Sequence, residues 1–262
     1  KKKLSNRLLP QLFEQTSERF NSKSASKDST GSLTYEELNQ RANQFSRFLI
    51  DKGLMKGDRI CVHMNTNLTF MIVFWGILKA GGVYVPVDIE YPRERVDYIL
   101  QDSSANFFIT DGEDKSSKNR ENIKVISARS LLSEISSYPM DNPNIPLQGS
   151  DPAYILYTSG TTGQPKGVEN THEAILNRII WMQERLTIDS SDRILQKTSI
   201  SFDVSVWELI LPHVTGAIQI LSDLGTVKDT EYIRRLISSE DVTVVHFVPS
   251  LLDIFLKGLL PM

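Results

Sequence analysis

The chain has little cysteine, little histidine and little net charge, and each scarcity excludes a class of protein. Its 262 residues include one cysteine, Cys61, which excludes an intramolecular disulfide and a multi-cysteine metal site. The four histidines show no metal-ligand spacing, so no metal site is predicted. The formal charge of −3, without a basic block, argues against nucleic acid or a membrane surface as a partner.

Long apolar runs are also missing. The longest, from Leu68 to Leu78, is too short to span a bilayer. Residues 1–7 lead into an amphipathic segment, which is not the pattern of a signal peptide. No G-x-S-x-G elbow supports serine hydrolase chemistry. We therefore expect a cytoplasmic protein, with Cys61 as a buried structural thiol in the apolar run RICVHM.

The pattern of apolar residues alternates between strands and helices of about ten or more residues. Thr34 is the expected N-cap of a long helix that ends at Gly53, and Glu37 is its capping-box partner. Other helices are expected at 8–20, 69–78, 92–100, 172–186, 204–211 and 230–238. Strands are expected at 59–64, 83–87, 105–110, 194–198, 217–221 and 242–247. This order predicts an α/β fold with a mostly parallel sheet covered on both faces.

Three segments interrupt this order. The polar run 22–32 is expected to be a loop, and the charged run 113–124 an exposed segment. The proline-rich stretch 138–152 is expected to be an extended connector between two lobes. We therefore expect a first α/β lobe with its connector at 1–152, and a second lobe at 153–262.

The segment YILYTSGTTGQPKGV, residues 154–168, has the composition of a polyphosphate-binding loop after a strand. Glycines let backbone N–H groups approach an anion, hydroxyls donate hydrogen bonds, and a lysine adds a point charge. The spacing G-x-x-G-x-x-K-G differs from that of a Walker A loop. The expected phosphate-binding residues are Thr158, Ser159, Gly160, Thr161, Thr162, Gly163 and Lys166.

A second segment with chemical meaning is FDVSVWE, residues 202–208. Asp203 has two possible roles: it caps the helix that follows, or it lies at the floor of a pocket with Trp207 on the same helical face. A carboxylate among apolar groups such as Phe202 and Trp207 would attract an ammonium ion strongly, because the local dielectric is low.

Four segments together resemble the adenylate-forming enzymes, and most closely the adenylation domains of nonribosomal peptide synthetases. They are TSGTTGQPKG, LTYEELNQRANQFSRFL, LKAGGVYVPVDIEYPRERVDYIL and FDVSVWE. The resemblance implies that Asp203 binds the α-amino group of an amino acid, and that Val204, Trp207 and His246 line the same pocket with Phe202. The set Asp, Val, Trp and His is similar to the pattern of serine-activating domains. His246 would bond the serine hydroxyl, or else be a structural histidine at the end of a strand.

The resemblance implies ATP and Mg²⁺ as the reaction partners of an amino acid. The aminoacyl-adenylate would pass to the phosphopantetheine thiol of a carrier domain, next to other synthetase modules. His172 would contact phosphate or cap the following helix. The family's catalytic lysine and its C-terminal lobe have no counterpart in this sequence, so no catalytic residue is assigned and the chain alone is expected to be inactive. Two alternatives stay open: an acyl- or aryl-CoA ligase, and a non-catalytic half of a split or interrupted domain.

Overall fold

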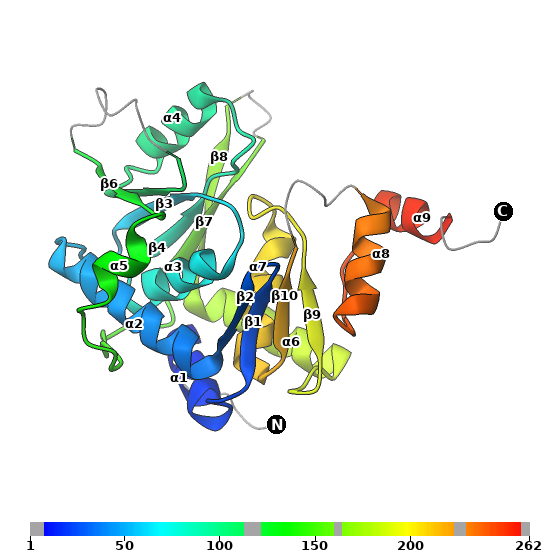
Figure 1. The fold of residues 1–262 in the computed structure, drawn as a ribbon. Coiled ribbons are helices and arrows are strands. Elements are labelled where there is room, and N and C mark those ends of the chain that lie inside the picture. Colours follow the sequence, from blue (N-terminus) through cyan, green and yellow to red (C-terminus); the bar gives the residue numbers. More distant parts are fainter. Residues whose placement is uncertain (1–7, 113–121, 160–163, 223–228, 258–262) are drawn as a thin grey trace.

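The computed structural model describes residues 8–112, 122–159, 164–222 and 229–257 (Figure 1). The helices are α1 Leu9–Arg19, α2 Tyr35–Asp51, α3 Leu68–Lys79, α4 Arg93–Asp102, α5 Leu131–Ile135, α6 His172–Leu186, α7 Asp203–Thr215, α8 Thr230–Ser239 and α9 Pro249–Lys257. The strands are β1 Ser24–Asp28, β2 Gly31–Thr34, β3 Arg59–His63, β4 Val83–Pro86, β5 Phe107–Thr110, β6 Lys124–Ser127, β7 Pro152–Thr158, β8 Lys166–Thr171, β9 Arg193–Gln196 and β10 Ile218–Leu221.

These strands form two sheets. One has six strands in the order β6-β5-β3-β4-β7-β8, and only the β7–β8 pair is antiparallel. The other has four strands in the order β2-β1-β10-β9, with β1–β2 as its antiparallel pair. The expected α/β class with mostly parallel sheets is therefore confirmed.

Strand pairing crosses residue 152 in both directions. Strand β7 lies after this residue and pairs with β4, while β1 lies before it and pairs with β10. The two sheets are thus not divided at this point of the chain. A division into domains at residue 152 stays a prediction.

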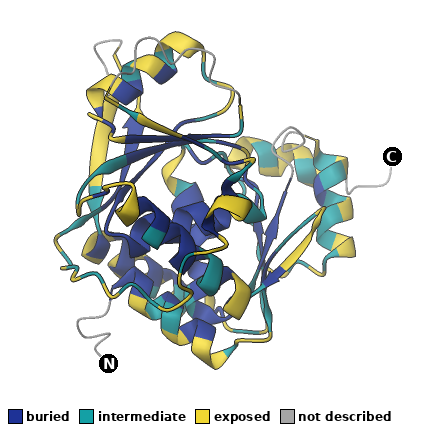
Figure 2. Cartoon of the chain, turned by 60° about the vertical axis from the view of Figure 1, so that its left-hand side comes forward, coloured by how far each residue is buried: buried dark blue, intermediate teal, exposed yellow. Residues whose placement is uncertain are grey.

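Most of the hydrophobic core lies between the two sheets. Residues of α1, α2, α3, α6 and α7 form one continuous buried cluster there, visible as the dark blue helices of Figure 2. On the outer face of the six-stranded sheet, α4 covers a second cluster that includes Cys61, and α8 covers a third on the four-stranded sheet. The prediction that Cys61 is buried is confirmed.

Local signals fix the long helix α2 and its packing. Thr34 Oγ1 accepts a hydrogen bond from the Glu37 N–H at 3.1 Å, and the Glu37 carboxylate accepts from the Thr34 N–H at 2.8 Å, so the predicted capping box is confirmed. Gly53 follows the helix at a φ of 85°, a left-handed conformation that favours glycine. Gly76 of α3 lets α2 approach closely, because a Cβ there would lie 2.6 Å from Phe45 Cδ1.

The predicted loop at 22–32 is wrong, because this segment forms the β1–β2 hairpin. Its polar side chains are accommodated by distant partners: Ser26 Oγ donates to Gln219 Oε1 at 3.1 Å and lies 2.9 Å from His213 Nε2. The strand predicted at 242–247 is also wrong, since it makes only an isolated bridge between Ile194 and Val244. The segment 113–121 lies outside the described residues.

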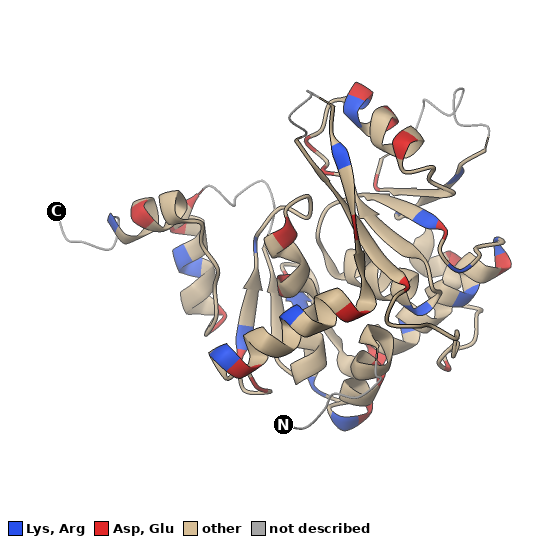
Figure 3. Cartoon of the chain, turned by 180° about the vertical axis from the view of Figure 1, so that it is seen from behind, with Lys and Arg blue, Asp and Glu red and all other residues tan. Residues whose placement is uncertain are grey.

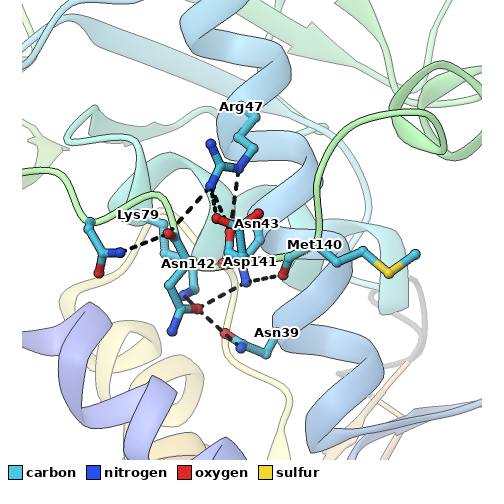
Figure 4. A network of polar contacts seen from close by, with 8 residues as sticks. Asn39, Asn43, Arg47, Lys79, Met140, Asp141 and Asn142 are labelled. Carbon is cyan, nitrogen blue, oxygen red and sulfur yellow. Dashed lines mark hydrogen bonds and ion pairs between the residues drawn. The ribbon is translucent and has the colours of Figure 1, made fainter.

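The proline-rich stretch 138–152 is irregular up to β7, as predicted, but it is fixed to the helical layer (Figure 4). Asn142 Oδ1 accepts hydrogen bonds from Asn43 at 2.9 Å and from the Lys79 ammonium at 3.2 Å. The buried Lys79 also forms an ion pair with Glu14. Burial lowers the pKa of Lys79 to about 8, and the nearby Glu14 carboxylate opposes that shift.

Candidate active site

The described parts of the phosphate-loop segment lie on the two arms of the antiparallel β7–β8 hairpin. Thr158, the last residue of β7, pairs with Lys166, the first residue of β8. Thr158, Ser159 and Lys166 are exposed, as residues that contact a ligand need to be. The predicted residues Gly160, Thr161, Thr162 and Gly163 lie outside the described residues.

The second predicted segment lies at the start of α7. The helix begins at Asp203 itself, and Phe202 is the N-cap without a side-chain hydrogen bond. The alternative in which Asp203 is the N-cap is therefore wrong. Asp203 Oδ1 accepts from the N–H of Val204 at 2.9 Å, and the side chain is exposed. This bond engages one carboxylate oxygen.

One cavity of about 1060 Å³ brings the two segments together. Of the predicted residues it is lined by Thr158, Ser159, Phe202, Asp203, Val204 and Trp207. Asp203 and Trp207 thus line the same cavity, and their roles in substrate binding stay predictions. Lys166, at the base of the loop, is not a lining residue.

His246 packs against Trp207 and is not a lining residue of the cavity. The two rings meet edge to face, with centroids 6.2 Å apart. The pKa of the half-buried His246 is lowered, first by burial and then by the charge of Lys197, while Asp203 opposes the shift. This shift favours the neutral imidazole, which both donates and accepts hydrogen bonds.

The cavity has further lining residues to which the sequence interpretation assigned no chemistry. Asp88, which follows β4, accepts hydrogen bonds from the hydroxyls of Ser199 and of Ser201, the latter at 3.2 Å. The Asp88 carboxylate thereby joins the end of β4 to the loop that carries Asp203. Its place in the YVPVD block, directly after a strand, was the available signal. Other lining residues are Glu90, Tyr91, Arg95, Asn170 and Arg178.

A buried carboxylate lies beneath this loop. Glu208 of α7 is fully buried, and its Oε2 accepts the N–H groups of Lys197 at 3.2 Å and of Thr198 at 3.0 Å. Its Oε1 accepts the Thr198 hydroxyl at 2.7 Å. Burial raises the pKa of Glu208 to about 7, although these hydrogen bonds and the charge of Lys197 act in the opposite direction.

His172 has neither of its two expected roles in this structure. It is fully buried, it is not a lining residue, and the N-cap of α6 is Thr171, whose side chain accepts from the Ala174 N–H. Burial lowers the pKa of His172 to about 4, so the ring is neutral. In the part of the chain that the structure describes, neither ring nitrogen has a hydrogen-bond partner. His172 is a buried residue at the start of α6, directly after β8.

Over the described ranges, three or more potential metal ligands never gather in one place. No helix in the same ranges is both long enough and apolar enough to cross a membrane. Charges of both signs are interspersed on the face shown in Figure 3.

Comparison with known proteins identifies the family. The model of the family described as "AMP-binding enzyme" matches residues 13–261. The chain belongs to the AMP-binding enzymes. Tyrocidine synthase 3 of Brevibacillus parabrevis is 38% identical over 225 residues, which is 85% of this chain and 3% of that protein.

Two solved structures resemble this chain over almost its whole length. The N-terminal subdomain of Klebsiella oxytoca NpsA, in complex with 3-hydroxybenzoyl-AMSN, has a TM-score of 0.85 at 28% identity, over 96% of this chain and 62% of that one. The nonribosomal peptide synthetase FmoA3, in its α-methyl-L-serine-AMP bound form, has a TM-score of 0.87 at 26% identity. The match covers 98% of this chain and 28% of that one. The expected resemblance to the N-terminal part of a synthetase adenylation domain is confirmed. The chain spans 3% to 43% of its first three curated relatives.

Proposed function

We propose that this chain binds ATP and an α-amino acid in the cavity of about 1060 Å³, as part of an enzyme that forms aminoacyl-adenylates. In that reaction a carboxylate oxygen of the amino acid bonds to the α-phosphorus of ATP, the bond to the β-phosphate oxygen breaks, and pyrophosphate leaves. The observation that carries the proposal is that Thr158 and Ser159 line the same cavity as Asp203 and Trp207. The two reactants would therefore meet in one space.

Asp203 would bind the substrate ammonium. Its Oδ1 is engaged with the Val204 N–H, which orients the carboxylate and leaves Oδ2 for a ligand. Trp207 supplies an apolar wall one helical turn away. The attraction between carboxylate and ammonium is strengthened where substrate binding excludes water.

The phosphates of ATP would lie at the hairpin tip. Thr158 and Ser159 line the cavity, and Lys166 lies opposite Thr158 at the base of the loop. Gly160 to Gly163 retain their predicted role from the sequence. An FmoA3 structure in an AMPPNP-bound form supports ATP as the nucleotide. Mg²⁺ would be held mainly by the phosphate oxygens, its common mode in such sites.

Serine is the proposed amino acid. Trp207 lines the cavity and would limit its depth. The hydrogen bond from His246 to the serine hydroxyl stays a prediction from the sequence, because in this structure the ring packs against Trp207 and does not line the cavity. The FmoA3 complex with α-methyl-L-serine-AMP supports this choice. The aminoacyl group would then pass to a phosphopantetheine thiol on a carrier domain, next to other synthetase modules. An NpsA–ThdA adenylation–PCP fusion supports such a partner.

An aryl-acid ligase is the second candidate, because NpsA binds 3-hydroxybenzoyl-AMSN. The two candidates differ at Asp203: an aryl acid has no α-ammonium, so a carboxylate there would be desolvated without a partner.

Binding of sulfamoyl-adenosine analogues to the chain tests both candidates by calorimetry. The seryl analogue is expected to bind more tightly than the alanyl, threonyl, glycyl and benzoyl analogues. Tighter binding of the benzoyl analogue would favour the aryl-acid ligase. Equal binding of the four aminoacyl analogues would contradict serine as the substrate. If none binds, the chain is a non-catalytic half and the proposed function is wrong.

A further inference from the structure

One face of α4 is fixed to both arms of the phosphate-loop hairpin. Asp102 Oδ2 accepts the hydroxyl of Tyr157 at 2.7 Å, and the hydroxyl of Tyr98 donates to the carbonyl of Pro165 at 3.0 Å. Tyr157 belongs to β7, and Pro165 directly precedes β8. Tyr98 lies about one helical turn before Asp102. Asp102 contacts the strand β7, whereas Tyr98 contacts Pro165, the residue between the loop and β8.

Arg95 lies on this same face, about one turn further in that direction. Residues three and four apart share a helix face, and Arg95, Tyr98 and Asp102 have this spacing. Arg95 also lines the cavity together with Thr158 and Ser159. The helix thus presents a cation at the loop side of the cavity.

The guanidinium of Arg95 is held in place but is not neutralised. Its central carbon lies 3.9 Å from the centroid of the Tyr91 ring, and its Nη2 donates to the Tyr91 hydroxyl at 3.3 Å. Its Nε is buried and has no hydrogen-bond partner among the described residues. Within the described ranges no carboxylate forms an ion pair with Arg95. A planar fork of donors in this state is suited to a phosphate group.

The other charged groups that line the cavity are Asp88, Glu90, Arg178 and Asp203. Asp88 is engaged by two serine hydroxyls, and Asp203 lies on α7 with the proposed amino-acid site. Arg178 is exposed and lies over the Trp181 ring at 5.0 Å. Helix α6 follows β8 directly, but α4 is the helix whose side chains hydrogen-bond to both arms of the hairpin, which favours Arg95 over Arg178.

We propose that Arg95 binds the β- and γ-phosphates of the nucleotide, as an additional cation beside Thr158 and Ser159. The inference rests on the proposed function, because it assigns a further contact to the same ATP. Arg95 adds bidentate donors from a rigid helix, whereas Lys166 contributes a single ammonium.

Calorimetric titration with ATP, AMP and inorganic tripolyphosphate, each with Mg²⁺, tests this inference. A hydrogen-bonded charge contact is typically worth about 1.5–3 kcal/mol, so Arg95→Gln should weaken ATP and tripolyphosphate binding about tenfold to a hundredfold. AMP binding should not change. Arg95→Lys, which keeps the charge but loses the fork, should lie between. Arg93→Gln is the matched control, because Arg93 lies on the same helix, is exposed and does not line the cavity.

Each outcome decides between the two proposals. Wild-type affinity for ATP in the Arg95→Gln variant, or an equal loss for AMP, overturns the role of Arg95. Equal melting temperatures of the Arg95→Gln and Arg93→Gln variants would show that a loss is not caused by unfolding, and Arg95→Lys decides if Arg95→Gln is unfolded. If the wild-type chain binds neither ATP nor any aminoacyl analogue, the proposed function itself fails.

Discussion

Replacing Glu208 with glutamine should make the chain more stable relative to the wild type as the pH rises. The amide oxygen can accept the N–H groups of Lys197 and Thr198, and the amide nitrogen can donate to the Thr198 hydroxyl. The substitution therefore keeps the packing and the number of hydrogen bonds. It removes the ability of this buried side chain to ionise.

The magnitude follows from the pKa of Glu208, which burial raises from 4.5 to about 7. Between these values the unfolded state has released the proton and the folded state has not, so the wild type loses stability as the pH rises. At about 1.4 kcal/mol per pKa unit, the total loss is about 3 kcal/mol. Burial lowers the pKa values of His172 and His213 to about 4, so these two residues make the protein more stable as the pH rises. Their effect is the same in the wild type and in Glu208→Gln, and it cancels in the difference between the two.

Urea unfolding followed by circular dichroism at about pH 5 and about pH 8 measures this difference. The stability of Glu208→Gln relative to the wild type should increase by roughly 2.5 kcal/mol over this interval. Glu18→Gln, at an exposed position of α1, is the control and should show no such change. A constant difference, or one of opposite sign, would show that Glu208 is ionised in the folded state and would refute the reasoning.

Three further substitutions test the fold and the site. Thr34→Ala removes the capping box of α2 and should cost about 1 kcal/mol in urea unfolding, and a change near zero would contradict the role of the cap. Gly76→Ala places a Cβ 2.6 Å from Phe45 and should cost about 1–3 kcal/mol, whereas a gain in melting temperature would show that the helices can separate without penalty. Asp88→Ala frees the hydroxyl of Ser201 and should weaken binding of the seryl analogue about tenfold at unchanged secondary structure, and calorimetry that finds wild-type affinity would argue against a positioning role.

Most of the fold could be predicted because its signals are local. The capping residues Thr34 and Glu37, the glycine at 53 and the all-apolar run of α3 each specify their element without help from distant residues. The β1–β2 hairpin could not be predicted in this way. Its polar sequence becomes a strand because Ser26 finds hydrogen-bond partners far along the chain, on α7 and β10. Residues 242–247 fail in the opposite sense, since their apolar composition brought only an isolated bridge from Val244 to Ile194 of β9 and no strand.

The candidate site shows the same difference between local sequence signals and tertiary placement. Motif chemistry predicted the side chains that would touch a ligand, such as Thr158 and Asp203. It did not identify the groups that depend on tertiary placement. Asp88 and Arg95 lie in a block of the sequence whose glycines and prolines suggested only turns and core. Glu208 ends the FDVSVWE segment, in which the sequence interpretation assigned chemistry to Asp203 and Trp207 but none to Glu208.

The most direct test of the central claim compares two ligands on two proteins. The ligands are the seryl-sulfamoyl-adenosine analogue and its N-acetyl form, which lacks the ammonium, and the proteins are the wild type and Asp203→Ala. If the cavity holds both reactants as proposed, the wild type should prefer the free amine at least about tenfold, and Asp203→Ala should bind both ligands equally. An equal preference in both proteins, or no binding to the wild type, would contradict the account.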